Sequence, residues 1–141
     1  MMTIDSGLFD HMVMQRNRRD VSDQTITGRV SERGIVEAKV SAGGKKTLRG
    51  WNWKRVGTAA RGRWQARLAG LSVGGPYRVA LRVQGAGGDE IVVDDVLVGD
   101  VWVLGGQSNM EGCGWCEHAL PSVPDVRAFY MTDEWDVARD P

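Results

Sequence analysis

The stretch that decides the fold is an apolar run that ends in two glycines and a polar triplet, Val96-Leu97-Val98-Gly99-Asp100-Val101-Trp102-Val103-Leu104-Gly105-Gly106-Gln107-Ser108-Asn109. Its first nine residues are nearly all aliphatic, β-branched or aromatic, which predicts a strand buried on both faces of a parallel sheet. The two glycines then allow a tight turn. Because ligands bind at the carboxyl ends of strands in open α/β sheets, Ser108 is a candidate nucleophile at the rim of a site.

A structural interpretation of the same turn stays open. Ser108 or Asn109 would then cap a following helix by accepting hydrogen bonds from its first free N–H groups. The G-x-S-x-G spacing of a nucleophile elbow is absent, so the α/β-hydrolase motif does not apply to this serine.

Length and composition place the chain among ordinary globular proteins. Its 141 residues suffice for one average domain, or for a small domain and part of another. Eighteen basic residues balance eighteen acidic ones, so the net charge directs it neither to nucleic acid nor to an anionic membrane. No apolar run reaches the roughly 18 residues of a membrane helix. The first residues lack the basic and apolar regions of a secretory signal, which predicts a cytoplasmic chain.

Between Val21 and Val93 the sequence predicts short strands separated by turn residues. Apolar and polar residues alternate in the clearest of them, residues 25–30, 35–40, 63–68 and 77–83. Such alternation is typical of antiparallel sheets with one buried face and one wet face. Turn signals about every ten residues favour a β-sandwich, which we assign to residues 8–95.

This region has one candidate ligand-binding segment on its surface, Trp51 and Trp53 followed by Lys54 and Arg55. Tryptophans flanked by cations can stack on sugar rings or on bases. Being two positions apart, they would face the same way on a strand, as core residues do. We therefore favour core or inter-domain packing, with sugar contact as the alternative.

Cys113 and Cys116 form a single Cys-Gly-Trp-Cys. This spacing fits a redox pair, which would open a helix directly after a strand. Ser108 and Asn109 already occupy that junction, so two reduced thiols in a loop are favoured. One pair also supplies only two of the four ligands of a structural zinc site, and the sequence indicates no metal and no other cofactor.

The chain resembles the sialate O-acetylesterase family of SGNH hydrolases. The resemblance is strongest at residues 95–102 (DVLVGDVW) and 106–111 (GQSNME), and extends to residues 8–16 (LFDHMVMQR). It implies that Ser108 is the nucleophile of an esterase acting on an O-acetylated sugar without a cofactor. Gln107 and Asn109 flank this serine and are candidate substrate-binding residues. The expected fold is mostly β, an antiparallel β-sandwich followed at residues 96–141 by the start of an α/β, SGNH-like hydrolase domain.

The resemblance also implies that the general base comes from an Asp-x-x-His motif late in the catalytic domain. This sequence holds only His11 and His118, and neither lies in such a motif. His11 is expected in the opening strand of the β-domain, in a structural or exposed position. We therefore expect an N-terminal portion that lacks the C-terminal part of the catalytic domain and is inactive alone. Many members of the family look exported, in contrast to the cytoplasmic prediction above.

Two other classes of function stay open. The first is a non-catalytic β-sandwich module that binds carbohydrate or docks a partner. The second is a thiol redox protein built on Cys113 and Cys116, which would require a depressed thiol pKa.

Overall fold

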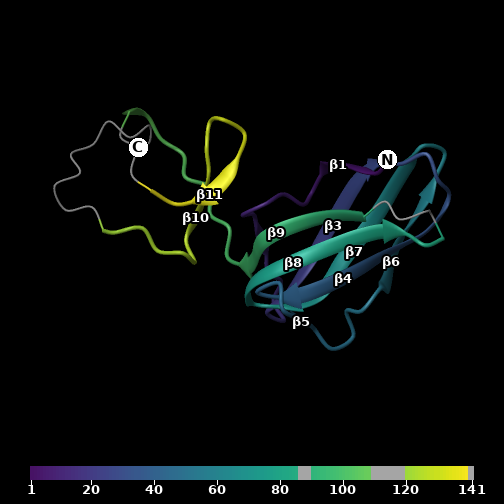
Figure 1. Ribbon diagram of the computed structural model, residues 1–141. Coiled ribbons are helices and arrows are strands. Elements are labelled where there is room, and N and C mark those ends of the chain that lie inside the picture. The colour runs from purple at the N-terminus through teal and green to yellow at the C-terminus, as the bar shows by residue number, and fades with distance from the viewer. Residues whose placement is uncertain (86–89, 109–119, 140–141) are drawn as a thin grey trace.

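The computed structural model describes residues 1–85, 90–108 and 120–139 (Figure 1). Nine strands form one sheet: β1 (Thr3–Ser6), β2 (Val13–Gln15), β3 (Val21–Arg29), β4 (Gly34–Ala42), β5 (Lys46–Thr47), β6 (Lys54–Ala60), β7 (Arg63–Ser72), β8 (Gly74–Val83) and β9 (Glu90–Gly99). A separate two-stranded sheet pairs β10 (Arg127–Phe129) with β11 (Trp135–Val137). Most of the described chain is therefore β, as predicted.

The large sheet is mixed and curled. Its strand order is β1-β3-β7-β6-β4-β8-β9-β2, with β5 attached to β4. Neighbouring strands are antiparallel except β2 and β9, which run parallel, so the prediction of a purely antiparallel arrangement is wrong at this one pairing. An isolated backbone bridge joins Arg16, directly after β2, to Ser22 in β3. The last strand of the order, β2, thus lies next to β3, the second strand, so the sheet curls back on itself.

The curled sheet encloses a single apolar core, and the predicted alternation supplies its members. One face of β4, β7 and β8 is buried, namely Val36, Ala38, Val40, Trp64, Ala66, Leu68, Tyr77, Val79, Leu81 and Val83. The strands themselves run one to four residues beyond most of the predicted ends, because pairing with neighbours continues past the strictly alternating segment.

The predicted strand over residues 96–104 is only half right. Residues 96–98 are buried, but they are the end of β9, which ends at Gly99. The last pair between β8 and β9 is Gly74 with Val98, and the last pair between β2 and β9 is Gln15 with Gly99. Beyond Gly99 neither neighbour continues, so the backbone has no ladder to join, and Val103 is 94% exposed.

The part of the chain beyond β9 does not show the start of an α/β domain. Figure 1 shows β10 and β11 beyond the end of β9, apart from the large sheet. The described residues after Gly99 contain no α-helix, and nowhere in residues 1–85, 90–108 and 120–139 is there a helix long and apolar enough to cross a membrane. β9 itself spans Asp95 and Val96, the positions at which the sequence predicts one domain to end and the next to begin.

The two tryptophans of the Trp51–Trp53 segment do not share one environment. Trp51 packs in the core and is 6% exposed, in agreement with the favoured interpretation. Trp53 lies just before β6 with a backbone φ of 54°, a left-handed conformation that a bulky residue rarely adopts. The expectation that both side chains face the same way is therefore wrong, because the segment is a bend and not a strand.

Candidate functional site

Ser108 is exposed at the end of an extended segment that leaves the sheet after β9. Gln107 beside it is exposed as well, whereas Asn109, the third predicted site residue, lies outside the described residues, as do Cys113, Cys116 and His118. Within the described ranges no hydrogen bond or ion pair involves the side chain of Ser108 or Gln107. The structure thus presents the predicted nucleophile to solvent, and none of the residues that it describes forms a hydrogen bond with the serine as a general base.

The first residues of this segment, Asp100 and Val101, are hydrogen-bonded to residues at the end of β2. The Arg16 guanidinium donates to both carboxylate oxygens of Asp100, with Nε–Oδ1 at 2.9 Å and Nη2–Oδ2 at 3.2 Å. The Val101 backbone N–H donates to Oε1 of Gln15 at 2.8 Å. The hydrogen bond from Arg16 lowers the pKa of Asp100, which stays ionised as the partner of this arginine.

A second polar constellation joins His11, Asp95 and Arg127. His11 Nδ1 lies 2.7 Å from Asp95 Oδ2, and Arg127 Nη2 donates to both oxygens of the same carboxylate at 2.8 Å. The side chain of Arg127 is only 4% exposed, and its Nε and Nη1 are buried without a hydrogen-bond partner in the described chain. His11 and Asp95 both have left-handed backbones, with φ of 61° and 57°. Such conformations cluster at functional sites and at tightly constrained turns.

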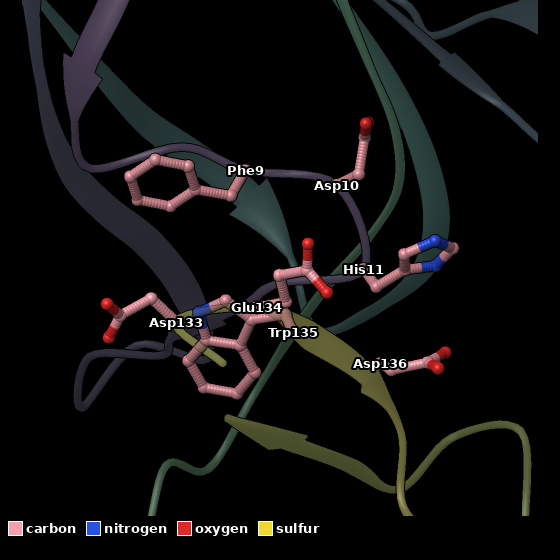
Figure 2. Close-up of a pocket in the computed structure, with 7 residues that line it drawn as sticks. All are labelled: Phe9, Asp10, His11, Asp133, Glu134, Trp135 and Asp136. Carbon is pink, nitrogen blue, oxygen red and sulfur yellow. The ribbon is translucent and has the colours of Figure 1, made fainter. Parts of the chain in front are cut away.

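An open cleft of about 470 Å³ lies beside this constellation. Phe9, Asp10 and His11 line it from the segment between β1 and β2, and residues 133–136 line it from the turn into β11 (Figure 2). The ring of Trp135 is supported from β10 by Phe129, at a centroid distance of 5.6 Å. The lining therefore combines two aromatic rings with four carboxylates, a composition that does not favour an anionic ligand.

The carboxylate of Asp95 orients the imidazole of His11, and no serine or cysteine of the described residues is bonded to this histidine. A histidine held by a carboxylate is the arrangement that general bases use. No hydrogen bond or ion pair among the described residues connects His11 with Ser108, and in residues 1–85, 90–108 and 120–139 no group of three or more His, Cys, Asp or Glu side chains is placed to hold a metal. Through Arg127 and Asp95 this constellation ties the β10–β11 pair to the large sheet.

Sequence reasoning missed the pairing of His11 with Asp95. The two residues are 84 positions apart, and no local pattern of either one indicates the other. The histidine was expected to be structural or exposed, and the aspartate was assigned only to a domain boundary.

Neither the comparison with protein-family models nor the search of curated proteins finds a match to this chain.

Proposed function

We propose that this chain is the N-terminal portion of a serine esterase that removes O-acetyl groups from sugars, with Ser108 as its nucleophile. The observation that carries the proposal is the sequence Gly-Gly-Gln-Ser-Asn-Met-Glu at residues 105–111, which resembles the family's nucleophile motif, together with the exposure of Ser108. In this proposal the curled sheet is the β-sandwich domain of residues 8–95, and residues 96–141 begin the α/β hydrolase domain.

The reaction has two steps. Ser108 Oγ attacks the acetyl carbonyl while a general base takes the hydroxyl proton. The tetrahedral intermediate then collapses as the base returns this proton to the sugar oxygen, which leaves as a free hydroxyl group. Water then attacks the acetyl-serine and releases acetate, which restores the serine. The oxyanion formed in each step requires fixed N–H donors, of which the Ser108 backbone N–H is one in this proposal.

Two features of the described chain support this assignment. Asp100 and Val101 are anchored to β2, so the segment that carries Ser108 starts from a fixed point of the sheet. The glycines at 105 and 106 lie three and two positions before the serine, and a backbone free of Cβ atoms lets a substrate carbonyl approach closely.

The experiment compares acetate release from p-nitrophenyl acetate by this chain and by its reading frame extended to the natural stop codon. Ser108→Ala and the matched control Ser122→Ala, an exposed serine elsewhere in the chain, are made in the extended protein. We expect turnover by the extended protein and by its Ser122→Ala variant, and loss of at least about a thousandfold in Ser108→Ala. An inactive extended protein, or a Ser108→Ala variant that is as active as the parent, overturns the proposal.

A second candidate function is a non-catalytic module that binds carbohydrate. The all-β character of the described chain favours it, together with the absence within these ranges of any base beside Ser108. In that case the extended protein binds an acetylated glycan without hydrolysing it, and Ser108→Ala binds it equally well.

A further inference from the structure

The charge of this chain is unevenly divided along the sequence. Residues 83–141 contain twelve aspartates and glutamates, two arginines and no lysine, although the whole chain has eighteen residues of each sign. One of these arginines, Arg127, is buried and bonded to Asp95. The other, Arg139, is exposed and lies 3.8 Å from Asp136. The later part of the chain is therefore strongly acidic, and the balanced net charge conceals this.

The open cleft between the segment before β2 and the turn into β11 is lined by four carboxylates. Asp133 and Glu134 are exposed, and their side chains form no hydrogen bond or ion pair with any residue that the structure describes. Asp10 and Asp136 each use one oxygen to accept a backbone N–H, at 2.7 Å. Within the described ranges the only ion pair of these four carboxylates is that of Asp136 with Arg139. The cleft therefore carries a negative charge that the described chain leaves largely uncompensated.

Two aromatic rings complete the lining of this cleft. Phe9, which is 44% exposed, comes from the segment between β1 and β2, and Trp135 comes from β11. Figure 2 shows the side chain of Glu134 extending from the β11 side toward the segment that carries Phe9. The faces of aromatic rings attract cations, and tryptophan does so most strongly. Rings and carboxylates in one cleft therefore favour a ligand with a positive charge attached to an apolar body.

The two walls of the cleft come from distant parts of the chain and are held together beside it. His11, which lines the cleft, has its Nδ1 2.7 Å from Asp95 Oδ2. Arg127 of β10 donates to both oxygens of the same carboxylate. β10 in turn pairs with β11, where Phe129 is opposite Trp135. The lining groups are thus positioned before a ligand arrives, which reduces the entropy lost on binding.

We propose that this cleft binds a small organic cation, an amine or a guanidine whose charged group lies among the carboxylates and whose apolar part lies against Trp135. The cleft volume of about 470 Å³ is that of a site for a small molecule. A concave surface with one sign of charge also concentrates ligands of the opposite sign. This binding does not involve Ser108 and goes beyond the proposed esterase activity.

Other classes of ligand fit this lining less well. An anion is repelled by the four carboxylates. A metal ion takes several protein ligands in close array, and among the residues that the structure describes no three His, Cys, Asp or Glu side chains are placed to hold one. A neutral sugar can stack on Trp135 and donate its hydroxyl groups to the carboxylates, but it gains less from their charge. The comparison of a charged ligand with a neutral one of the same shape therefore distinguishes these two.

The test is an NMR titration of this chain with benzylamine and with benzyl alcohol, which have nearly the same shape and differ in the positive charge. Binding is followed at the indole N–H signal of Trp135. In the test variant Asp133→Asn and Glu134→Gln are combined. The control variant combines Glu90→Gln and Asp125→Asn, which removes the same charge from exposed positions that do not line the cleft. Thermal unfolding of both variants checks that they are folded.

We expect benzylamine to bind with a Kd of about 1 mM, and benzyl alcohol to bind at least about tenfold more weakly. The Kd of benzylamine should rise about tenfold in the test variant, less than about twofold in the control, and also with rising salt concentration. Phe9→Leu, which removes a ring at an exposed position, should raise it about threefold. A Trp135 signal that does not respond to benzylamine, equal binding of the two ligands, or equal losses in both variants overturns the proposal.

Discussion

Arg16 and Asp100 form a two-point ion pair although they are 84 positions apart in the chain. Arg16 directly follows β2 and Asp100 directly follows β9, so their side chains extend the contact where the parallel backbone ladder has ended. Arg16 also donates to Asp20. One guanidinium thus connects the β2–β3 turn to the base of the segment that carries Ser108.

The first prediction concerns how the stabilising contribution of the Arg16–Asp100 ion pair depends on pH. The hydrogen bond from Arg16 keeps the pKa of Asp100 below its usual value of 3.8. Because the folded-state pKa is the lower one, the stabilising contribution is present above pH 3.8 and is lost as the pH falls through the folded-state pKa. We expect Arg16→Gln to raise the Asp100 pKa toward 3.8 in an NMR titration of the side-chain carboxyl carbon.

Asp23 is the internal control for this titration. Arg67 lowers the pKa of Asp23 in the same way, and the side chain of Arg16 is bonded to Asp100 and Asp20 and not to this pair. In Arg16→Gln the Asp23 titration should be unchanged. An Asp100 pKa that stays in place, or a parallel shift of Asp23, would show that Arg16 is not the cause.

A second prediction concerns the two halves of the apolar run. Val96 is fully buried in the core of the large sheet, and Val103 is 94% exposed. Val96→Ala should lower the free energy of unfolding by about 2 kcal/mol, since it removes two buried methyl groups and leaves a cavity. Val103→Ala should change it by less than about 0.5 kcal/mol. Urea unfolding followed by circular dichroism measures both, and equal effects would contradict the assignment of residues 96–98 to the β core.

A third prediction concerns the contact between β1, β3 and β7 at Gly28. A Cβ at this position would lie 1.9 Å from the Thr3 carbonyl oxygen and 2.5 Å from Trp64 Nε1. These two atoms share a hydrogen bond of 2.9 Å. Gly28→Ala should therefore destabilise the protein by about 2–3 kcal/mol, because backbone must move.

Gly99→Ala is the matched control in the same unfolding experiment. A Cβ at Gly99 would meet only the Val13 side chain, at an ordinary contact distance of 3.7 Å. A change of less than about 0.5 kcal/mol is expected there. If Gly28→Ala is as mild as Gly99→Ala, the close approach of Thr3 and Trp64 to Gly28 does not exist in solution.

The fourth prediction concerns the attachment of β10 and β11. Asp95→Asn removes the charge between His11 and the buried Arg127 guanidinium, which leaves a buried cation without its partner. Hydrogen exchange of the β10–β11 backbone amides should accelerate at least about tenfold, while exchange in β4 stays the same. Asp133→Asn, at an exposed carboxylate with no side-chain partner among the described residues, should accelerate neither set. The same exchange rates in both variants would exclude Asp95 as the attachment.

The sequence predicted four strands of the large sheet, β3, β4, β7 and β8, because the alternation that marks them is local. Whether Val79 and Leu81 alternate with polar neighbours can be read within a single strand, and the buried face of β8 follows from that period alone. β6 was missed because Lys54 and Arg55 begin it and Gly57 interrupts it, so no alternation marks this strand. Gly57 is nevertheless required, because a Cβ there would lie 1.9 Å from the Gln65 carbonyl oxygen.

The candidate site could be predicted only in part. Glycines followed by a polar triplet indicate a turn, and Gln107 and Ser108 are indeed exposed after an extended segment. The partner of His11 could not be predicted, since Asp95 comes to it only through the parallel pairing of β2 with β9.

By itself, then, the sequence determined which faces of the strands are buried, because side-chain periodicity and hydrophobic burial are properties of neighbouring residues. Only the tertiary structure decided that the apolar run is buried before Gly99 and exposed after it, because β8 and β2 both stop pairing with β9 there. A strand continues only as far as a partner offers backbone hydrogen bonds, and that partner is chosen by distant parts of the chain.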